Sequence, residues 1–205
     1  MLEAGTVPTV RLTEVFRQAQ SSLIVTNAHR INRGEFPHLN QSDGDFFVIE
    51  EKDSEQVLSL VVKLVADRLP AHYGVDPLED IQVLSPIRRT KVGTGILNHH
   101  LQAALNPPGR GKEQVDFKDG VFRVGDKVMQ TENDYDKKVF NGDMGRIISL
   151  DAENQSLVVE FSDAEDTRYI SYQRSDWEQL ELSYAISVHK SQGSEYPIVV
   201  MPLVW

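Results

Sequence analysis

The segment "SVHKSQGSEYP", residues 187–197, gathers several side chains that could do chemistry. It places a histidine, a lysine and a glutamine before Gly193 and an acid at Glu195, directly before the apolar run "IVVMPL". Glycine lets a backbone come close to a ligand, and glutamine can hydrogen-bond a phosphate or a water without adding charge. The residue types therefore indicate a polar binding turn that is positioned by a buried strand.

Other catalytic patterns are absent from the sequence. A nucleotide-hydrolysing enzyme needs the phosphate loop GxxxxGK[ST], and the nearest segment, "GRGKEQ", lacks the spacing and has Glu113 in place of Ser or Thr. No Gly-x-Ser-x-Gly and no His-Glu-x-x-His occurs, and the adjacent His99 and His100 would point in different directions on a helix. We expect no metal site and no complete catalytic site in this chain alone.

Composition indicates a folded, water-soluble chain. Of its 205 residues, 40% are hydrophobic and 25% are charged, and no apolar run approaches the roughly 18 residues that span a bilayer. The absence of cysteine excludes disulfides and thiolate chemistry and fits a cytoplasmic location. We expect no membrane association.

The net charge of −10 is unevenly distributed. Residues 1–115 hold 12 basic and 14 acidic residues, residues 116–177 hold 8 and 14, and residues 178–205 hold 1 and 3. The acidic middle predicts a separate module, whereas the flanks could still offer a local phosphate-binding face.

The patterning before residue 110 favours an α/β domain. "RLTEVF", "DFFVIEE" and "DIQVLSP" have the composition of strands, and helical spacing is expected in residues 21–34, 53–69 and 93–106. This alternation predicts a parallel sheet flanked by helices.

After residue 109 the pattern changes to short strands separated by Gly, Asn and Asp turns, and "NGD" is a hairpin-turn sequence. This predicts a small β-barrel of about 55 residues inserted in the α/β domain. "WEQLELSYAISVHKSQG" returns to helical periodicity, and "IVVMPL" to a buried strand.

Four segments resemble superfamily 1 DNA helicases of the RecD type, which include the exodeoxyribonuclease V alpha subunit. "YAISVHKSQGSEYPIVVMPL" resembles motif V, and "LTEVFRQAQSSLIVTNAHRINRG" resembles motif IV. "VLSPIRRTKVGTGILNHHLQAALNP" resembles the strand and helix that follow, and "FRVGDKVMQTENDYDKKVFNGDMGRI" the start of the SH3-like insert. The four segments occur in the family's order and cover nearly the whole chain.

The resemblance implies the second motor domain of such a helicase. Residues 1–115 and 178–205 would form the RecA-like domain 2A, without motif VI, and residues 116–177 the SH3-like domain 2B. The intact protein would use ATP and Mg²⁺, held largely by an N-terminal RecA-like domain of the same polypeptide. It would move 5′ to 3′ on single-stranded DNA in repair or recombination, alone or with nuclease-complex subunits. The fragment alone is expected to bind no cofactor and to be inactive.

The resemblance also assigns nucleotide contacts. Arg17 matches the motif IV arginine that reaches the γ-phosphate and, with Gln192, would be catalytic. Gln192 and Gly193 would approach the phosphates, and Glu195 would accept hydrogen bonds from the ribose. Arg17 could instead be a solvated arginine, and Glu195 a surface acid.

The DNA contacts expected from the resemblance are His189, Lys190, Arg88 and Asn98. His189 and Asn98 could equally serve packing alone. Arg88 follows a strand at the edge where ligands of open α/β sheets bind.

Two alternatives remain from the sequence. The chain could be a non-catalytic binding module whose barrel docks a protein partner, or the helicase half of a conjugative relaxase.

Overall fold

The computed structural model describes residues 22–39, 44–86, 90–118, 120–162 and 166–203. The chain divides into two compact units, residues 1–50 and residues 51–205, and each is described by itself. Arg17 and Arg88 lie outside the described residues, as does the predicted strand "RLTEVF".

The first unit contains helix α1 (Leu23–Asn32), which confirms the helix predicted there. Ser22 caps α1 by accepting a hydrogen bond from the Val25 amide, and Asp45 accepts bonds from the Ser22 hydroxyl and the Leu23 amide. These bonds lower the pKa of Asp45, the Ser22 bond most of all. Asp45, which follows α1 in the chain, therefore helps to cap the start of the same helix.

The strand predicted at "DFFVIEE" is absent from the structure. Residues 46–53 adopt no regular element, and Phe47 and Ile49 are exposed. A strand requires a ladder of hydrogen bonds with a neighbouring strand, and the sheets among the described residues do not include this segment. The apolar alternation alone did not produce a strand.

The second unit opens with a long helical segment. Helix α2 (Ser54–Lys63) confirms the helix predicted to begin in residues 53–69, and it is capped by Asp53, whose carboxylate accepts bonds from the Glu55 and Gln56 amides. A π-helical turn, η3 (Leu64–Arg68), joins it to helix α3 (Leu69–Tyr73), which ends at Gly74.

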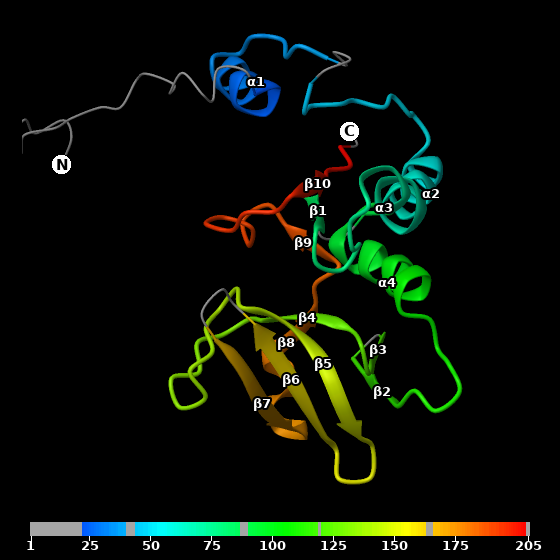
Figure 1. Cartoon of the computed structure of the whole chain (residues 1–205), viewed down its shortest axis with the longest axis vertical. Helices are drawn as coiled ribbons and strands as arrows, with labels where there is room; N and C mark the ends of the chain where they lie inside the picture. Colours follow the sequence, from blue (N-terminus) through cyan, green and yellow to red (C-terminus); the bar gives the residue numbers. More distant parts are fainter. Residues whose placement is uncertain (1–21, 40–43, 87–89, 119, 163–165, 204–205) are drawn as a thin grey trace, which may run out of the picture. The chain divides into compact units, whose positions relative to one another are not determined.

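A parallel sheet of three strands lies beside these helices (Figure 1). Strand β1 (Ile81–Ser85) is central and completely buried, between β9 (Ala185–Ser187) and β10 (Ile198–Val200). Helix α4 (Thr94–Leu105) and α2 pack on this sheet. The core between them consists of Val57, Val61, Val65, Ile81, Val83, Val92, Leu97, Leu101, Tyr184 and Ala185.

A five-stranded antiparallel sheet forms the second layer of this unit, in the order β7-β6-β5-β4-β8. Its strands are β4 (Lys127–Gln130), β5 (Met144–Asp151), β6 (Ser156–Ser162), β7 (Thr167–Gln173) and β8 (Leu180–Leu182). The sheet confirms the predicted barrel-like insert and reaches residue 182, beyond the expected boundary at residue 177.

Smaller elements complete this part of the fold. Strands β2 (Gln114–Phe117) and β3 (Gly120–Arg123) form a hairpin, and the 3₁₀ helix η4 (Arg174–Gln179) buries Trp177 in the barrel core. The predicted turn at "NGD" is confirmed, with Gly142 at a φ of +102°.

The prediction of a helix in residues 177–193 is wrong. The structure has the end of η4, then β8, β9 and a turn. Trp177, Leu180 and Tyr184 satisfy helical spacing, yet β8 pairs with β4 and β9 pairs with β1. Tertiary pairing therefore decides a local pattern that allowed either structure.

Within the described residues, the structure contains no helix of sufficient length and apolar character to cross a bilayer.

Candidate functional site

A tight turn of residues 188–193 follows β9 at the carboxyl end of the parallel sheet. The Lys190 amide donates to the Ser187 carbonyl at 2.9 Å, and the Ser191 hydroxyl donates to the Val188 carbonyl at 2.8 Å. Gly193 closes the turn with a φ of +88°, which glycine adopts without strain. The turn thus lies at the edge where open α/β sheets bind ligands.

The residues expected to contact the nucleotide lie at the end of this turn. Gln192, Gly193 and Glu195 are all exposed. The Gln192 and Glu195 side chains hydrogen-bond to nothing in the ranges that the structure describes, and a Cβ at Gly193 would have no described atom within 4 Å apart from those of the adjoining residues. These groups are accessible to a ligand, and their nucleotide contacts stay predictions.

His189 and Lys190, expected at the DNA, differ in their surroundings. His189 is exposed, whereas the Lys190 ammonium forms an ion pair with Glu181 of β8, with 2.7 Å between Nζ and Oε2. The Lys190 side chain is 22% exposed and the Glu181 side chain 51%. Lys190 therefore links the turn to the barrel.

Asn98, also expected at the DNA, is engaged within the protein. Its amide nitrogen donates to the Ala185 carbonyl and its oxygen accepts from the Ala185 amide, each at 2.9 Å. These two hydrogen bonds attach α4 to β9, the strand that leads into the turn. These hydrogen bonds agree with the alternative that Asn98 serves packing, and a DNA contact of Asn98 stays a prediction.

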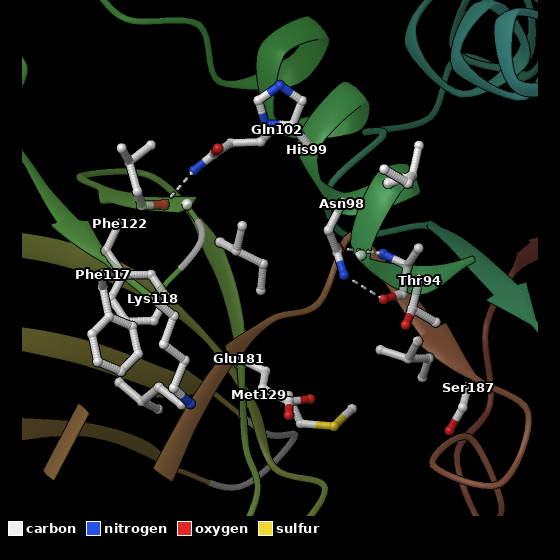
Figure 2. A pocket seen from close by; sticks show the side chains of 18 of the residues that line it. Thr94, Asn98, His99, Gln102, Phe117, Lys118, Phe122, Met129, Glu181 and Ser187 are labelled. Carbon is white, nitrogen blue, oxygen red and sulfur yellow. Dashed lines mark hydrogen bonds between the residues drawn. The ribbon is translucent and has the colours of Figure 1, made fainter. Parts of the chain in front are cut away.

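A groove of about 1220 Å³ lies beside the turn. Figure 2 shows Asn98, His99 and Gln102 of α4 on one side, Phe117, Lys118 and Phe122 of the hairpin on the other, and Met129 and Glu181 between them. Ser187 and Lys190 extend the lining to the start of the turn. The α/β core and the barrel thus contribute one wall each.

The lining of the groove is basic and partly aromatic. Lys91, Lys118 and Lys190 line it, and Glu181 is the single acid among the described lining residues. Lys91 pairs with Glu55 at 2.5 Å, whereas the Lys118 ammonium lies 4.9 Å from the centre of the Phe117 ring. Phe117 stacks on Phe122 with 5.0 Å between ring centres. The lysines suit a nucleic-acid strand because they offer partners to its phosphates, whereas the Phe117 and Phe122 rings are buried in the barrel core and support the wall.

Asp126 fixes the two walls of the groove to each other. This fully buried carboxylate accepts hydrogen bonds from Gln102 of α4, from Asn106 that follows α4, from the Tyr184 hydroxyl and from the Arg123 amide, at 2.6–2.9 Å. Burial raises the pKa of Asp126, although the four hydrogen bonds oppose this shift. Gln102 also donates to the Val121 carbonyl of β3 (Figure 2). The core and the barrel therefore share a buried polar joint.

Lys118 and Glu181 were missed from the sequence. Lys118 had a detectable signal, because "DFKDGVF" places a lysine between aromatic residues at a hairpin turn. Glu181 had none, because its pairing with Lys190 depends on β8 lying beside the turn.

In the part of the chain that the structure describes, no group of three or more His, Asp or Glu side chains could hold a metal ion.

Comparisons with known proteins agree with the fold and with the four motif-like segments. Residues 97–161 match the SH3 domain of ATP-dependent RecD-like DNA helicases. The ATP-dependent RecD2 DNA helicase of Deinococcus radiodurans is 34% identical over 197 residues, which cover 96% of this chain and 25% of that protein. The probable conjugal transfer protein TraA of Sinorhizobium fredii is 28% identical over 145 residues, 69% of this chain and 12% of that protein.

A solved structure supports the fold. The crystal structure of the Pif1 helicase from Bacteroides in complex with ADP-AlF3 and ssDNA superposes with a TM-score of 0.51 at 18% identity. The match covers 94% of this chain and 45% of that one. It confirms the expected class, an α/β parallel sheet flanked by helices with a small SH3-like barrel.

The chain spans about a quarter of the length of the RecD2 helicase that it matches. The alignment with that helicase covers almost the whole chain, and the SH3 match covers most of α4 and part of the barrel. This chain is therefore similar to the RecD-like DNA helicases over nearly its whole length.

Proposed function

We propose that this chain is the C-terminal motor half of an ATP-dependent DNA helicase that moves 5′ to 3′ on single-stranded DNA in repair or recombination. Residues 1–115 and 178–205 form its domain 2A, and residues 116–177 its domain 2B. The observation that carries the proposal is the position of the turn 188–193. The turn has a basic groove at its start and the exposed Gln192 and Glu195 at its end.

The groove would hold part of the DNA strand. Lys118 and Lys190 supply ammonium groups for phosphates, and the buried Phe117 and Phe122 rings form part of the groove wall. The overall charge of −10 is no obstacle, because the acid in this groove is limited, among the described residues, to Glu181. His189 and Arg88 are further candidate DNA contacts.

The nucleotide would meet the other end of the same turn. ATP with Mg²⁺ would be held mainly by an N-terminal RecA-like domain of the same polypeptide, because this sequence lacks the phosphate loop. Hydrolysis of ATP would supply the free energy for movement. Arg17 and Gln192 would contact the γ-phosphate, with Gly193 allowing close approach and Glu195 binding the ribose. Subunits of a nuclease complex are further candidate partners.

The test of the DNA assignment is Lys118→Gln in the full-length protein. We expect single-strand affinity to fall about fivefold at 0.1 M salt, with a salt slope shallower by about 0.7, because one phosphate contact is lost. The measurement is fluorescence anisotropy with a labelled single strand over a salt series.

The matched control is Lys63→Gln, which removes an exposed lysine of α2 outside the groove lining. Equal losses in the two variants would mean that the groove is not the DNA surface. A protein that binds no single strand at any salt concentration would contradict the helicase proposal and favour the protein-docking module.

The similarity to TraA favours a second candidate, the helicase half of a conjugative relaxase. Both candidates use the same groove and turn. DNA nicking by the full-length protein at a defined sequence would distinguish the relaxase from the repair helicase.

A further inference from the structure

We propose that Glu181 is an affinity-determining residue that competes with DNA phosphate for the Lys190 ammonium. This inference rests on the proposed DNA-binding role of the groove. Without DNA, Glu181 holds Lys190; when a strand enters, a phosphate takes the place of the carboxylate. Glu181 would thereby weaken binding of a strand that places a phosphate at Lys190, because the phosphate must first displace the carboxylate.

The geometry of the pair supports exchange. Lys190 Nζ lies 2.7 Å from Glu181 Oε2, and both side chains line the groove. Glu181 is 51% exposed, so solvent and ligands can reach its carboxylate, whereas Lys190 is 22% exposed. An incoming phosphate oxygen can therefore meet Lys190 in the groove without unfolding either element.

The backbone hydrogen bonds fix the positions from which the Glu181 and Lys190 side chains extend. Glu181 pairs with Met129 across the β4–β8 ladder, and its neighbour Leu180 is buried in the barrel core. Alternation along the strand therefore directs Glu181 out of the barrel. On the other side, the hydrogen bond from the Lys190 amide to the Ser187 carbonyl fixes the base of the lysine. Only the two side-chain ends can exchange partners.

Among the charged residues that line the groove, Glu181 is the one whose charge opposes the binding of DNA. The other described charged residues in its lining are Lys91 and Lys118, and Lys91 already has Glu55 as a partner outside the lining. Exposed ion pairs contribute little to folding stability, so removing the carboxylate should leave the barrel intact. The carboxylate matters instead when a polyanion approaches, because it both occupies Lys190 and repels phosphate.

The experiment compares Glu181→Gln, Lys190→Gln and the double variant in the full-length protein. Glu181→Gln should bind a labelled single strand about two- to fivefold more tightly at low salt, the range expected for an exposed ion pair. Its salt slope should be steeper by about 0.7, because Lys190 is then free for one phosphate. In the Lys190→Gln background, removal of Glu181 should give at most a small part of that gain.

Glu178→Gln is the matched control, because Glu178 is an exposed acid of the same region outside the groove lining. Thermal unfolding of each variant by circular dichroism checks that the fold is retained, and Glu181→Thr serves if the glutamine variant is unstable.

The two proposals fail in different ways. If the wild-type protein binds single strands but Glu181→Gln binds equally or less tightly, the competition is refuted. The same holds if Glu178→Gln gives an equal gain, or if the gain persists fully without Lys190. If the wild-type protein binds no single strand, the proposed function itself fails.

Discussion

Asn98 illustrates how one residue can support a binding site without touching the ligand. Its amide pairs with both backbone groups of Ala185, the first residue of β9. The turn that carries Lys190 and Gln192 begins at the end of that strand. Asn98 therefore sets the position of the turn relative to α4, and an effect of its removal on DNA binding could be indirect.

Asn98→Ala should destabilise the protein by about 1–3 kcal/mol, because it leaves the buried amide and carbonyl of Ala185 without their partner. The change should appear in the midpoint of chemical denaturation. Asn154→Ala is the control, since Asn154 is exposed and hydrogen-bonds to Asp151 in its own turn. A loss of DNA affinity at unchanged stability would instead establish a direct DNA contact.

At the scale of elements, sequence patterns predicted the helices and turns that depend on residues close together in the chain. The caps at Ser22 and Asp53 start α1 and α2, and the glycine at residue 142 makes its turn. Each depends on residues a few positions apart. The residues 46–51 and 177–193 were misjudged because strand formation depends on a partner far along the chain. The ion pair of Glu181 with Lys190 was unpredictable for the same reason.

The barrel and the α/β core are joined by Asp126, and this joint affects where a deletion can be made. Trp177, Leu180 and the hairpin residue Phe117 all belong to the barrel core. Excising residues 116–177 would leave Leu180 and Leu182 without the sheet they pack in. We therefore expect the α/β part to fold when residues 107–182 are replaced by a Gly-Ser linker, and to fold less stably when only residues 116–177 are replaced.

Circular dichroism and cooperative thermal melting of the two deletion variants test this expectation. In the longer deletion, Gln102, Asn106 and Tyr184 lose Asp126 as acceptor, and removal of the barrel would open these groups to water, which can replace the lost hydrogen bonds. An unfolded chain after the longer deletion would mean that the barrel is integral to the α/β core.

At the scale of the whole molecule, the two ligands of the proposed helicase would meet at one short turn. Asn98 attaches β9 to α4, Asp126 attaches α4 to the barrel, and Lys190 returns from the turn to the barrel through Glu181. A change of partner at Lys190 is therefore close in the chain to Gln192. This arrangement offers a physical route by which DNA could influence the nucleotide site.

The last prediction concerns Arg17, which the resemblance to motif IV assigns to the nucleotide and which lies outside the described residues. In the full-length protein, Arg17→Ala should lower ATP turnover by on the order of 10³-fold, because a guanidinium at the γ-phosphate stabilises charge in the transition state. Single-strand affinity without nucleotide should be nearly unchanged. DNA-stimulated ATPase assays and fluorescence anisotropy measure the two quantities, and Arg33→Ala, which removes an exposed arginine of the α1 end, is the control. Normal turnover combined with lost DNA affinity would move Arg17 from the nucleotide cleft to the DNA surface, and the motif IV assignment would be wrong.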